Sequence, residues 1–178
     1  MSVLAALSSA GPYSFAQNQF IDVAAVNKAD ARAYRTLFRR VNTYKALTDN
    51  GRAENREMPY LKEGIVRRLG ISYQDFEALE RIAGECESEL RPIQTQIQWT
   101  VGEFRKHYSK ANRNPQDAVN ASSKLSDLQA QEDAIILRYR DRFRNAIDEV
   151  VFQRVQDQVR MNFGITLSAA QTAESEAK

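Results

Sequence analysis

About forty consecutive residues, from Lys124 to Phe163, contain neither glycine nor proline. Apolar side chains recur within this stretch at intervals of three and four residues, which is the spacing of one helix face. They are Leu125, Leu128, Ile135, Ile136, Tyr139, Phe143, Ile147, Val150, Val151, Val155 and Val159. The stretch therefore predicts one helix that ends at Gly164 and begins either at Asn114 and Pro115 or nearer Lys124. At 1.5 Å per residue it would be about 60 Å long, so it needs a second long helix beside it.

A second apolar stripe, from Phe76 to Phe104, supplies that partner. Ser72 and Asp75 predict its start, because a serine followed three residues later by a carboxylate can satisfy the first free backbone N–H groups. Pro92 interrupts the stripe and removes a helix donor, so we expect a kink or a short break at residues 88–91. The stripe resumes in phase, which favours the kink.

Two shorter helices are expected before these. The first covers residues 27–50, with Asn27 as its N-cap and Asn50 and Gly51 as its end. The second begins at Pro59 and is closed by Gly70. The predicted fold is all-α: an antiparallel helical bundle or hairpin of four principal helices, two of them long. At its centre, Phe143, Ile147 and Val150 are expected to be buried against Ile82, Leu90 and Ile97.

The chain has 178 residues, which suits one domain. We expect a single helical domain at 27–164 and a polar, Ala-rich tail at 165–178. Residues 1–26 are read either as a flexible arm or as the remnant of an export signal, since Ser14, Phe15 and Ala16 resemble the end of such a signal but no basic region precedes them. No run approaches the roughly 18 apolar residues of a membrane span, so none is expected.

Few residues are available for catalysis or metal binding. The sequence has one cysteine and one histidine, which excludes an intrachain disulfide and the usual metal clusters. Cys86 lies on an apolar stripe and is expected to be buried and inert, whereas His107 is expected to face solvent. No phosphate-binding glycine loop, nucleophile elbow or paired-carboxylate pattern is present. We therefore expect no enzyme activity, no metal and no cofactor.

The net charge is only +2, but two segments are locally basic. Arg32, Arg35 and Arg39 share one face of the 27–50 helix, and Arg138, Arg140, Arg142 and Arg144 lie close together in the last helix. Glutamates of the 72–104 helix can neutralise both segments, which favours ion pairs within the bundle over a nucleic-acid footprint. A cytosolic nucleic-acid-associated protein remains the alternative.

The segment from Ile71 to Phe76, and that from Leu167 to Gln171, resemble the Leu-Thr-x-x-Gln helix start of the small periplasmic stress proteins of the Spy and CpxP type. The stretch from Leu125 to Ile135 and the turn from Ile82 to Glu87 also resemble related uncharacterised exported bacterial proteins. This resemblance spans residues 34–163. It implies an oligomeric, non-catalytic helical protein of the periplasm or extracellular space, with a chaperone-like, scaffold or stress-response role.

The last expectation concerns self-association. Val151, Val155 and Val159 drift to the side of the apolar stripe in the last helix, and the shorter helices cannot cover the whole of a 60 Å hairpin. Exposed apolar surface of this kind usually marks a protein contact. These three valines, with Arg32, Arg35 and Arg39, are the predicted partner-binding residues. A homodimer or larger assembly is expected through the distal part of the long hairpin.

Overall fold

The structure is a computed structural model that describes residues 22–53, 59–108 and 115–163, all of them in helices, short turns or caps. Its five helices are α1 (Val23–Ala53), α2 (Pro59–Leu69), α3 (Tyr73–Tyr108), α4 (Pro115–Arg144) and α5 (Glu149–Phe163). The all-α prediction is confirmed. The expected N-terminal arm, as far as residue 21, the tail and the motif from Leu167 to Gln171 lie outside the described residues.

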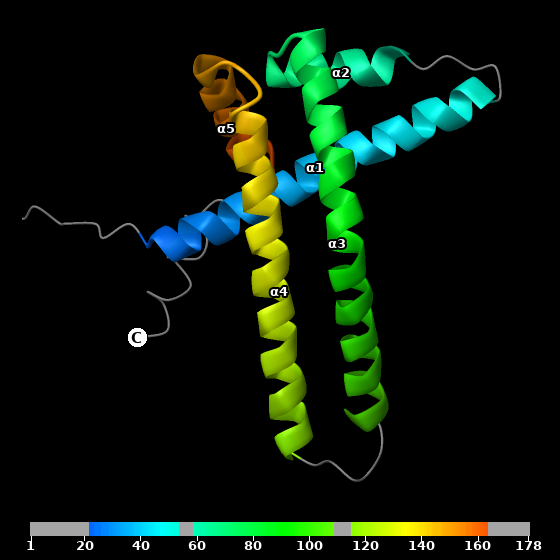
Figure 1. The fold of residues 1–178 in the computed structure, drawn as a ribbon, viewed down its shortest axis with the longest axis vertical. Coiled ribbons are helices and arrows are strands. Elements are labelled where there is room, and N and C mark those ends of the chain that lie inside the picture. Colours follow the sequence, from blue (N-terminus) through cyan, green and yellow to red (C-terminus); the bar gives the residue numbers. More distant parts are fainter. Residues whose placement is uncertain (1–21, 54–58, 109–114, 164–178) are drawn as a thin grey trace, which may run out of the picture.

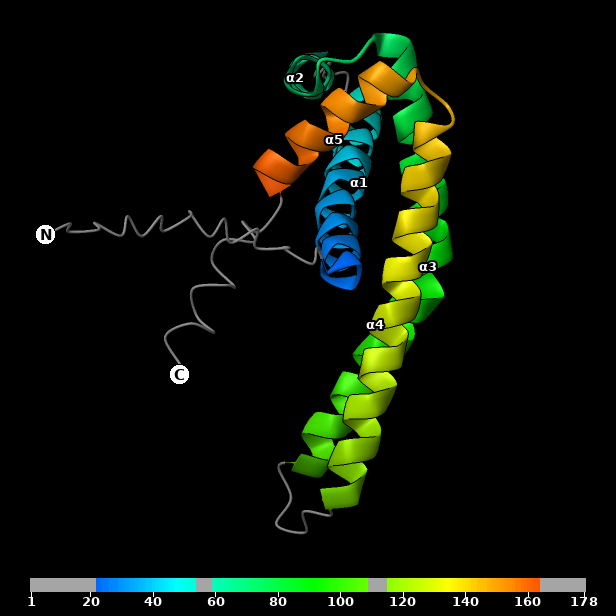
Figure 2. The ribbon, with the colours of Figure 1, turned by 90° about the vertical axis from the view of Figure 1, so that its left-hand side faces the viewer.

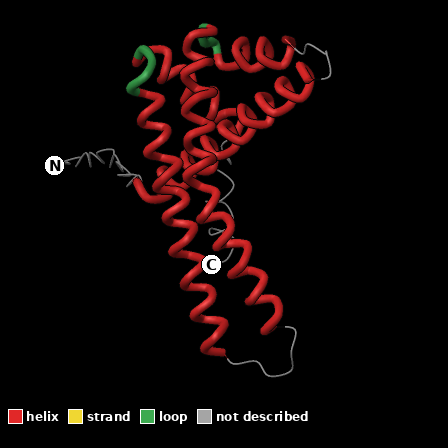
Figure 3. The backbone as a smooth tube through the Cα atoms, turned by 45° about the vertical axis from the view of Figure 1, so that its right-hand side comes forward, coloured by secondary structure: helices red, strands yellow, loops and turns green. Residues whose placement is uncertain are grey.

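Helices α3 and α4 lie side by side as a long antiparallel hairpin, and α1 crosses both of them in the upper half of the view (Figure 1). Helices α2 and α5 lie beside α1 at the same end (Figure 2). Short loops join α2 to α3 and α4 to α5 near the top of the molecule (Figure 3). The lower half of the hairpin therefore extends away from the other described helices.

Helix α1 is longer at both ends than the sequence predicts. Its N-cap is Asp22, whose Oδ1 accepts hydrogen bonds from the backbone N–H groups of Ala24 at 2.9 Å and Ala25 at 3.3 Å. The predicted start at Asn27 is wrong because this carboxylate satisfies the free donors one turn earlier. The predicted end is also wrong, since the helix continues through a buried Gly51 to Ala53.

The ends of α2 and α3 agree with the prediction. Helix α2 stops at Gly70, whose φ of 64° is a left-handed conformation that glycine adopts without strain. At the start of α3, Ser72 Oγ accepts a hydrogen bond from the Asp75 N–H at 3.1 Å, and the Ser72 N–H donates to Asp75 Oδ2 at 3.2 Å. This is the expected capping box. Helix α3 then continues through Pro92, so the alternative of a short break is wrong.

The earlier of the two predicted starts, at Pro115, is confirmed, but the prediction of one continuous helix to residue 163 is wrong, because the chain turns between Arg144 and Glu149. Asp148 caps α5 by accepting a hydrogen bond on Oδ1 from the Val150 N–H at 2.8 Å. Arg144 donates two hydrogen bonds to Glu149 across the turn, at 2.8 and 2.9 Å. The turn lets α5 fold back and pack on α1.

The core lies where α1, α3, α4 and α5 meet. Its largest fully buried side chains are Tyr34, Leu37 and Val41 of α1, Phe76, Leu79 and Ile82 of α3, Ile136 and Phe143 of α4, and Phe152, Val155 and Val159 of α5, with Leu69 at the end of α2. The predicted burial of Ile82, Leu90 and Phe143 is confirmed. Ile97 and Ile147 are only half-buried. Val150 is 68% exposed, so its predicted burial is wrong, because it follows the turn and lies in the first turn of α5.

Candidate functional site

The described residues hold no group of three or more His, Cys, Asp or Glu side chains that could bind a metal ion. Cys86 is buried, and its burial raises the pKa of the thiol to about 12. A thiol with such a high pKa carries almost no thiolate at neutral pH and is a poor nucleophile. The inert role predicted for Cys86 therefore fits its surroundings. The side chain of His107 lies outside the described part of the chain.

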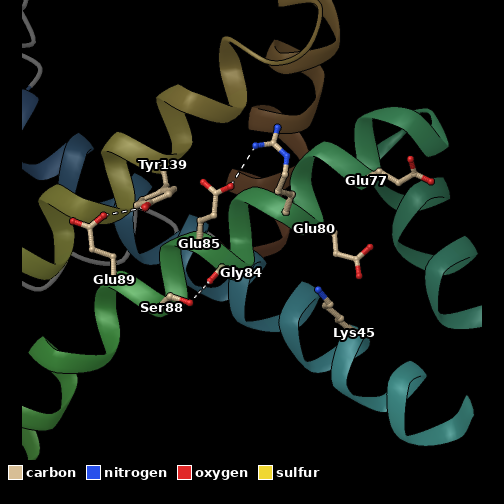
Figure 4. A pocket seen from close by; sticks show the side chains of 9 residues that line it. Lys45, Glu77, Glu80, Gly84, Glu85, Ser88, Glu89 and Tyr139 are labelled. Atoms are coloured by element: carbon tan, nitrogen blue, oxygen red, sulfur yellow. Dashed lines mark hydrogen bonds and ion pairs between the residues drawn. The ribbon is translucent and has the colours of Figure 1, made fainter. Parts of the chain in front are cut away.

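One open polar hollow runs along α3 between α1 and α4 (Figure 4). Four carboxylates line it, those of Glu77, Glu80, Glu85 and Glu89, together with Lys45, Arg81, Gly84, Ser88 and Tyr139. Because it is open and lined by charged side chains, this hollow is a candidate for a catalytic or binding site.

Most of these carboxylates have a cationic partner. Glu85 accepts hydrogen bonds from Arg142 at 2.6 Å and from Arg81 at 3.3 Å. Glu89 accepts one from Arg138 and one from the Tyr139 hydroxyl at 2.9 Å, and these bonds lower the pKa of Glu89. A carboxylate with a lowered pKa stays ionised and does not serve as a general acid. The hollow is best described as an ion-pair network that joins α3 to α4.

Some of the basic residues predicted from the sequence form ion pairs within the fold, and others are exposed. Arg35 is half-buried and pairs with Glu132 at 2.5 Å and Asp133 at 3.6 Å, both on α4 rather than on the glutamate-rich α3. Arg32 and Arg39 are exposed on α1. Pairing of the α4 arginines with glutamates of α3 is confirmed, as the contacts of Arg138 and Arg142 show.

The predicted valine surface does not exist in this fold. Val155 and Val159 are fully buried, and Val151 is half-buried against the core. The sequence predicts that they are exposed because they lie to one side of the apolar stripe of α4. They belong instead to a separate helix, α5, which packs on α1. Val155 and Val159 therefore have no exposed surface in this fold, and Val151 retains only part of its own.

A buried carboxylate fixes α5 in place. Asp30 of α1 is 3% exposed and accepts two hydrogen bonds from Arg160 of α5, both at 2.8 Å. Arg140 of α4 and Gln156 of α5 approach the same carboxylate at 3.3 and 3.4 Å. Asp30 therefore links three helices, and it serves the fold rather than a ligand.

The side chains of the α3–α4 hairpin are buried to different extents above and below the point where α1 crosses it. Beside α1 its inner side chains are buried, among them Ile82, Cys86, Leu90, Ile136 and Phe143. Residues 95–105 and 116–128, which we call the distal hairpin, contribute no side chain to the main core cluster. There Thr100 and Leu128 are buried, but the other apolar side chains of the seam, Ile97, Val101, Phe104, Ala121 and Leu125, are only half-buried. Two helices alone cannot enclose the seam between them.

Part of the distal hairpin carries no charge, and its charged residues lie toward the ends of the two segments: Glu103, Arg105, Asp117, Lys124 and Asp127. No charged residue occurs from Pro92 to Gly102 or from Ala118 to Ser123, although 27% of the whole chain is charged. Trp99 is 62% exposed and Val119 60% exposed. The Lys124 ammonium group lies 5.2 Å from the centre of the Trp99 ring. Protein interfaces are depleted in charge and enriched in tryptophan, so this is the candidate functional surface.

The sequence predicted the uncovered surface at Val151, Val155 and Val159, and named none of the exposed side chains of the distal hairpin. The signal that could have found them is the uncharged run from Pro92 to Gly102, with the only tryptophan of the chain inside it.

Comparison with known proteins finds no matching family model, no similar curated protein and no similar solved structure. Within the described ranges, no helix has the length and apolar character needed to cross a membrane.

Proposed function

We propose that this protein is not an enzyme and works by binding protein, with the distal hairpin as its binding surface and a second copy of the chain as the occupant. The observation that carries the proposal is the half-buried seam of α3 and α4 below the crossing of α1. Two such hairpins can enclose each other's seams as a four-helix arrangement. The uncharged runs at residues 92–102 and 118–123 support pairing of identical surfaces, because like charges facing each other would oppose it.

The resemblance to small exported stress proteins supports the wider part of the proposal. On that basis the assembly acts as a scaffold or a chaperone-like protein outside the cytoplasm. Fractionation of cells that express the native gene tests the location: recovery in the periplasmic or extracellular fraction supports it, and recovery with cytoplasmic enzymes contradicts it.

Self-association is tested by chromatography with light scattering on the full chain at tens of micromolar. We expect a mass above that of the 20.3 kDa monomer. A triple variant, Gln98→Glu with Trp99→Glu and Ser122→Glu, places charge at three exposed positions of the distal hairpin and should run as a monomer.

The matched control places three glutamates at exposed positions elsewhere: Gln74→Glu, Val150→Glu and Gln153→Glu. This control should associate like the unmodified chain. A monomeric unmodified chain at tens of micromolar, or equal association by the distal triple variant and the parent, would sink the self-association proposal.

A further inference from the structure

A second surface, separate from the distal hairpin, lies between α1 and α2. Side chains of both helices line a groove of about 460 Å³ that is open to solvent. On α1 the lining residues are Thr36, Arg39, Arg40, Thr43, Tyr44 and Leu47, and on α2 they are Leu61 and Ile65. Its volume lies in the range of roughly 300–1,000 Å³ typical of binding pockets.

The floor of the groove is apolar. Leu47 is 45% exposed, and Leu61 and Ile65 are half-buried, so their side chains still face solvent. Leu61 and Ile65 are four residues apart and therefore share one face of α2. The hydroxyls of Thr36 and Thr43 donate to carbonyl groups of their own helix, at 3.0 and 2.9 Å, and so add little polarity to the groove.

The two helices that form the groove each carry a net positive charge. Helix α1 has seven Lys and Arg against two Asp, and α2 has three against one Glu. Helix α3, in contrast, has seven Asp and Glu against four Lys and Arg. Arg39 lines the groove itself and is exposed, while Arg32 lies about two turns away on the same helix. The groove is thus an apolar trough within a basic surface.

We infer that this groove binds an acidic amphipathic helix, whose apolar side chains enter the trough while its carboxylates lie against the arginines of α1. Docking of an amphipathic helix into an apolar groove is a common mode of protein recognition, with anchors spaced four residues apart. The complementary charge would raise the association rate and orient the helix along α1. The partner is thereby defined by two properties together, an apolar stripe and a negative net charge.

The shape of the groove argues against other anionic partners. A lipid surface needs apolar side chains that project outward, whereas these side chains lie in a concavity. Single-stranded nucleic acid needs exposed aromatic rings for stacking, and Tyr44, the aromatic residue that lines the groove, is buried. A second copy of the same groove would bring arginines against arginines.

The test uses the full chain and a fluorescently labelled synthetic helix of about fifteen residues, with leucines at i, i+4, i+7 and i+11 and glutamates on the flanking positions. Fluorescence anisotropy should rise with protein concentration, and the affinity should fall at higher salt because the charge contacts are exposed. A peptide of the same composition in scrambled order should bind at least about tenfold more weakly, a difference of 1.4 kcal/mol.

Two variants locate the site. Leu47→Glu places a carboxylate in the trough and should weaken binding by at least about tenfold. Val150→Glu also replaces an exposed apolar side chain by glutamate, but it lies on α5 and should leave binding unchanged. Arg39→Glu should weaken binding several-fold and flatten its salt dependence, and Arg91→Glu on α3 serves as its control.

Three outcomes would overturn the inference. The first is no rise in anisotropy with either the ordered or the scrambled peptide. The second is equal loss in the Leu47→Glu and Val150→Glu proteins. The third is binding to phosphatidylserine vesicles or to a 20-nucleotide single strand that Leu47→Glu abolishes while the ordered peptide fails to compete, which would assign the groove to a different class of partner.

Discussion

Replacing Asp30 by alanine tests how the helices are held together. Asp30 is almost fully buried and accepts two hydrogen bonds at 2.8 Å from Arg160. A hydrogen bond to a charged group contributes about 1.5–3 kcal/mol. Arg160 is nearly half exposed and regains water when the carboxylate is removed, and Arg140 keeps Asp141 at 2.7 Å. We therefore expect Asp30→Ala to lower the free energy of unfolding by about 2–4 kcal/mol, less than the roughly 3–5 kcal/mol seen when a fully buried pair is broken.

Urea unfolding followed by circular dichroism measures this loss, and Asp127→Ala, an exposed carboxylate on α4, is the control with an expected change below about 0.5 kcal/mol. Because Asp30 holds α5, hydrogen exchange at the amides of Val155 and Val159 should accelerate more than exchange in the distal hairpin. A loss below about 1 kcal/mol, or uniform acceleration over all helices, would refute the assigned role of Asp30.

Four further predictions concern the core and individual groups. Phe143→Ala should cost about 3–5 kcal/mol in urea unfolding because Phe143 is fully buried, while Val150→Ala should cost less than about 0.5 kcal/mol. Gly70→Ala should cost more than about 1 kcal/mol in the same assay, since its φ is 64° and the added Cβ would lie 3.2 Å from a neighbouring side-chain carbon. Cys86 should resist iodoacetamide at pH 8 in the folded protein and react after unfolding, because burial raises its pKa to about 12. The pKa of Glu89 is lowered in the folded state, so its contribution is present above the ordinary carboxyl pKa and is lost as pH falls; Glu89→Gln should flatten the decline of stability with acid.

Local signals in the sequence predicted much of the fold. The capping box at Ser72 and Asp75 and the stop at Gly70 depend on neighbouring residues only, and both are confirmed. The apolar stripe of α3 is likewise a property of one helix, and its upper part is buried as expected.

The division between α4 and α5 could not be predicted from breakers, because the turn contains neither glycine nor proline. Its local signal was Asp148 followed by Glu149, an N-cap and a first-turn acid inside an apparently continuous helix. The turn is stabilised mainly by tertiary contacts. When α5 folds back, Val155 and Val159 are buried in the core, whereas a straight helix would leave both side chains in water. The sideways drift of these valines was therefore evidence for a second helix.

The candidate surfaces also differ in whether they depend on local sequence signals or on tertiary contacts. Helix lengths predicted that part of the long hairpin is uncovered, but the sequence assigned that surface to Val151, Val155 and Val159, two of which are fully buried. It did not identify the groove between α1 and α2, because Leu47 and Leu61 come together only through the crossing of two helices. Arg39 was named as a partner-binding residue for its charge, and the structure places it beside that groove.

The fluorescence of Trp99 gives the most direct test of the proposed function. It is the only tryptophan in the chain, lies on the distal hairpin and is 62% exposed in the single chain. If two hairpins pair, its emission maximum should shift to shorter wavelength as the concentration rises from about 0.1 to about 100 µM, since water leaves the ring. The variant with Gln98→Glu and Ser122→Glu retains Trp99 and should keep the long-wavelength emission throughout. An emission maximum that stays constant in the unmodified chain over this range would contradict the pairing of distal hairpins.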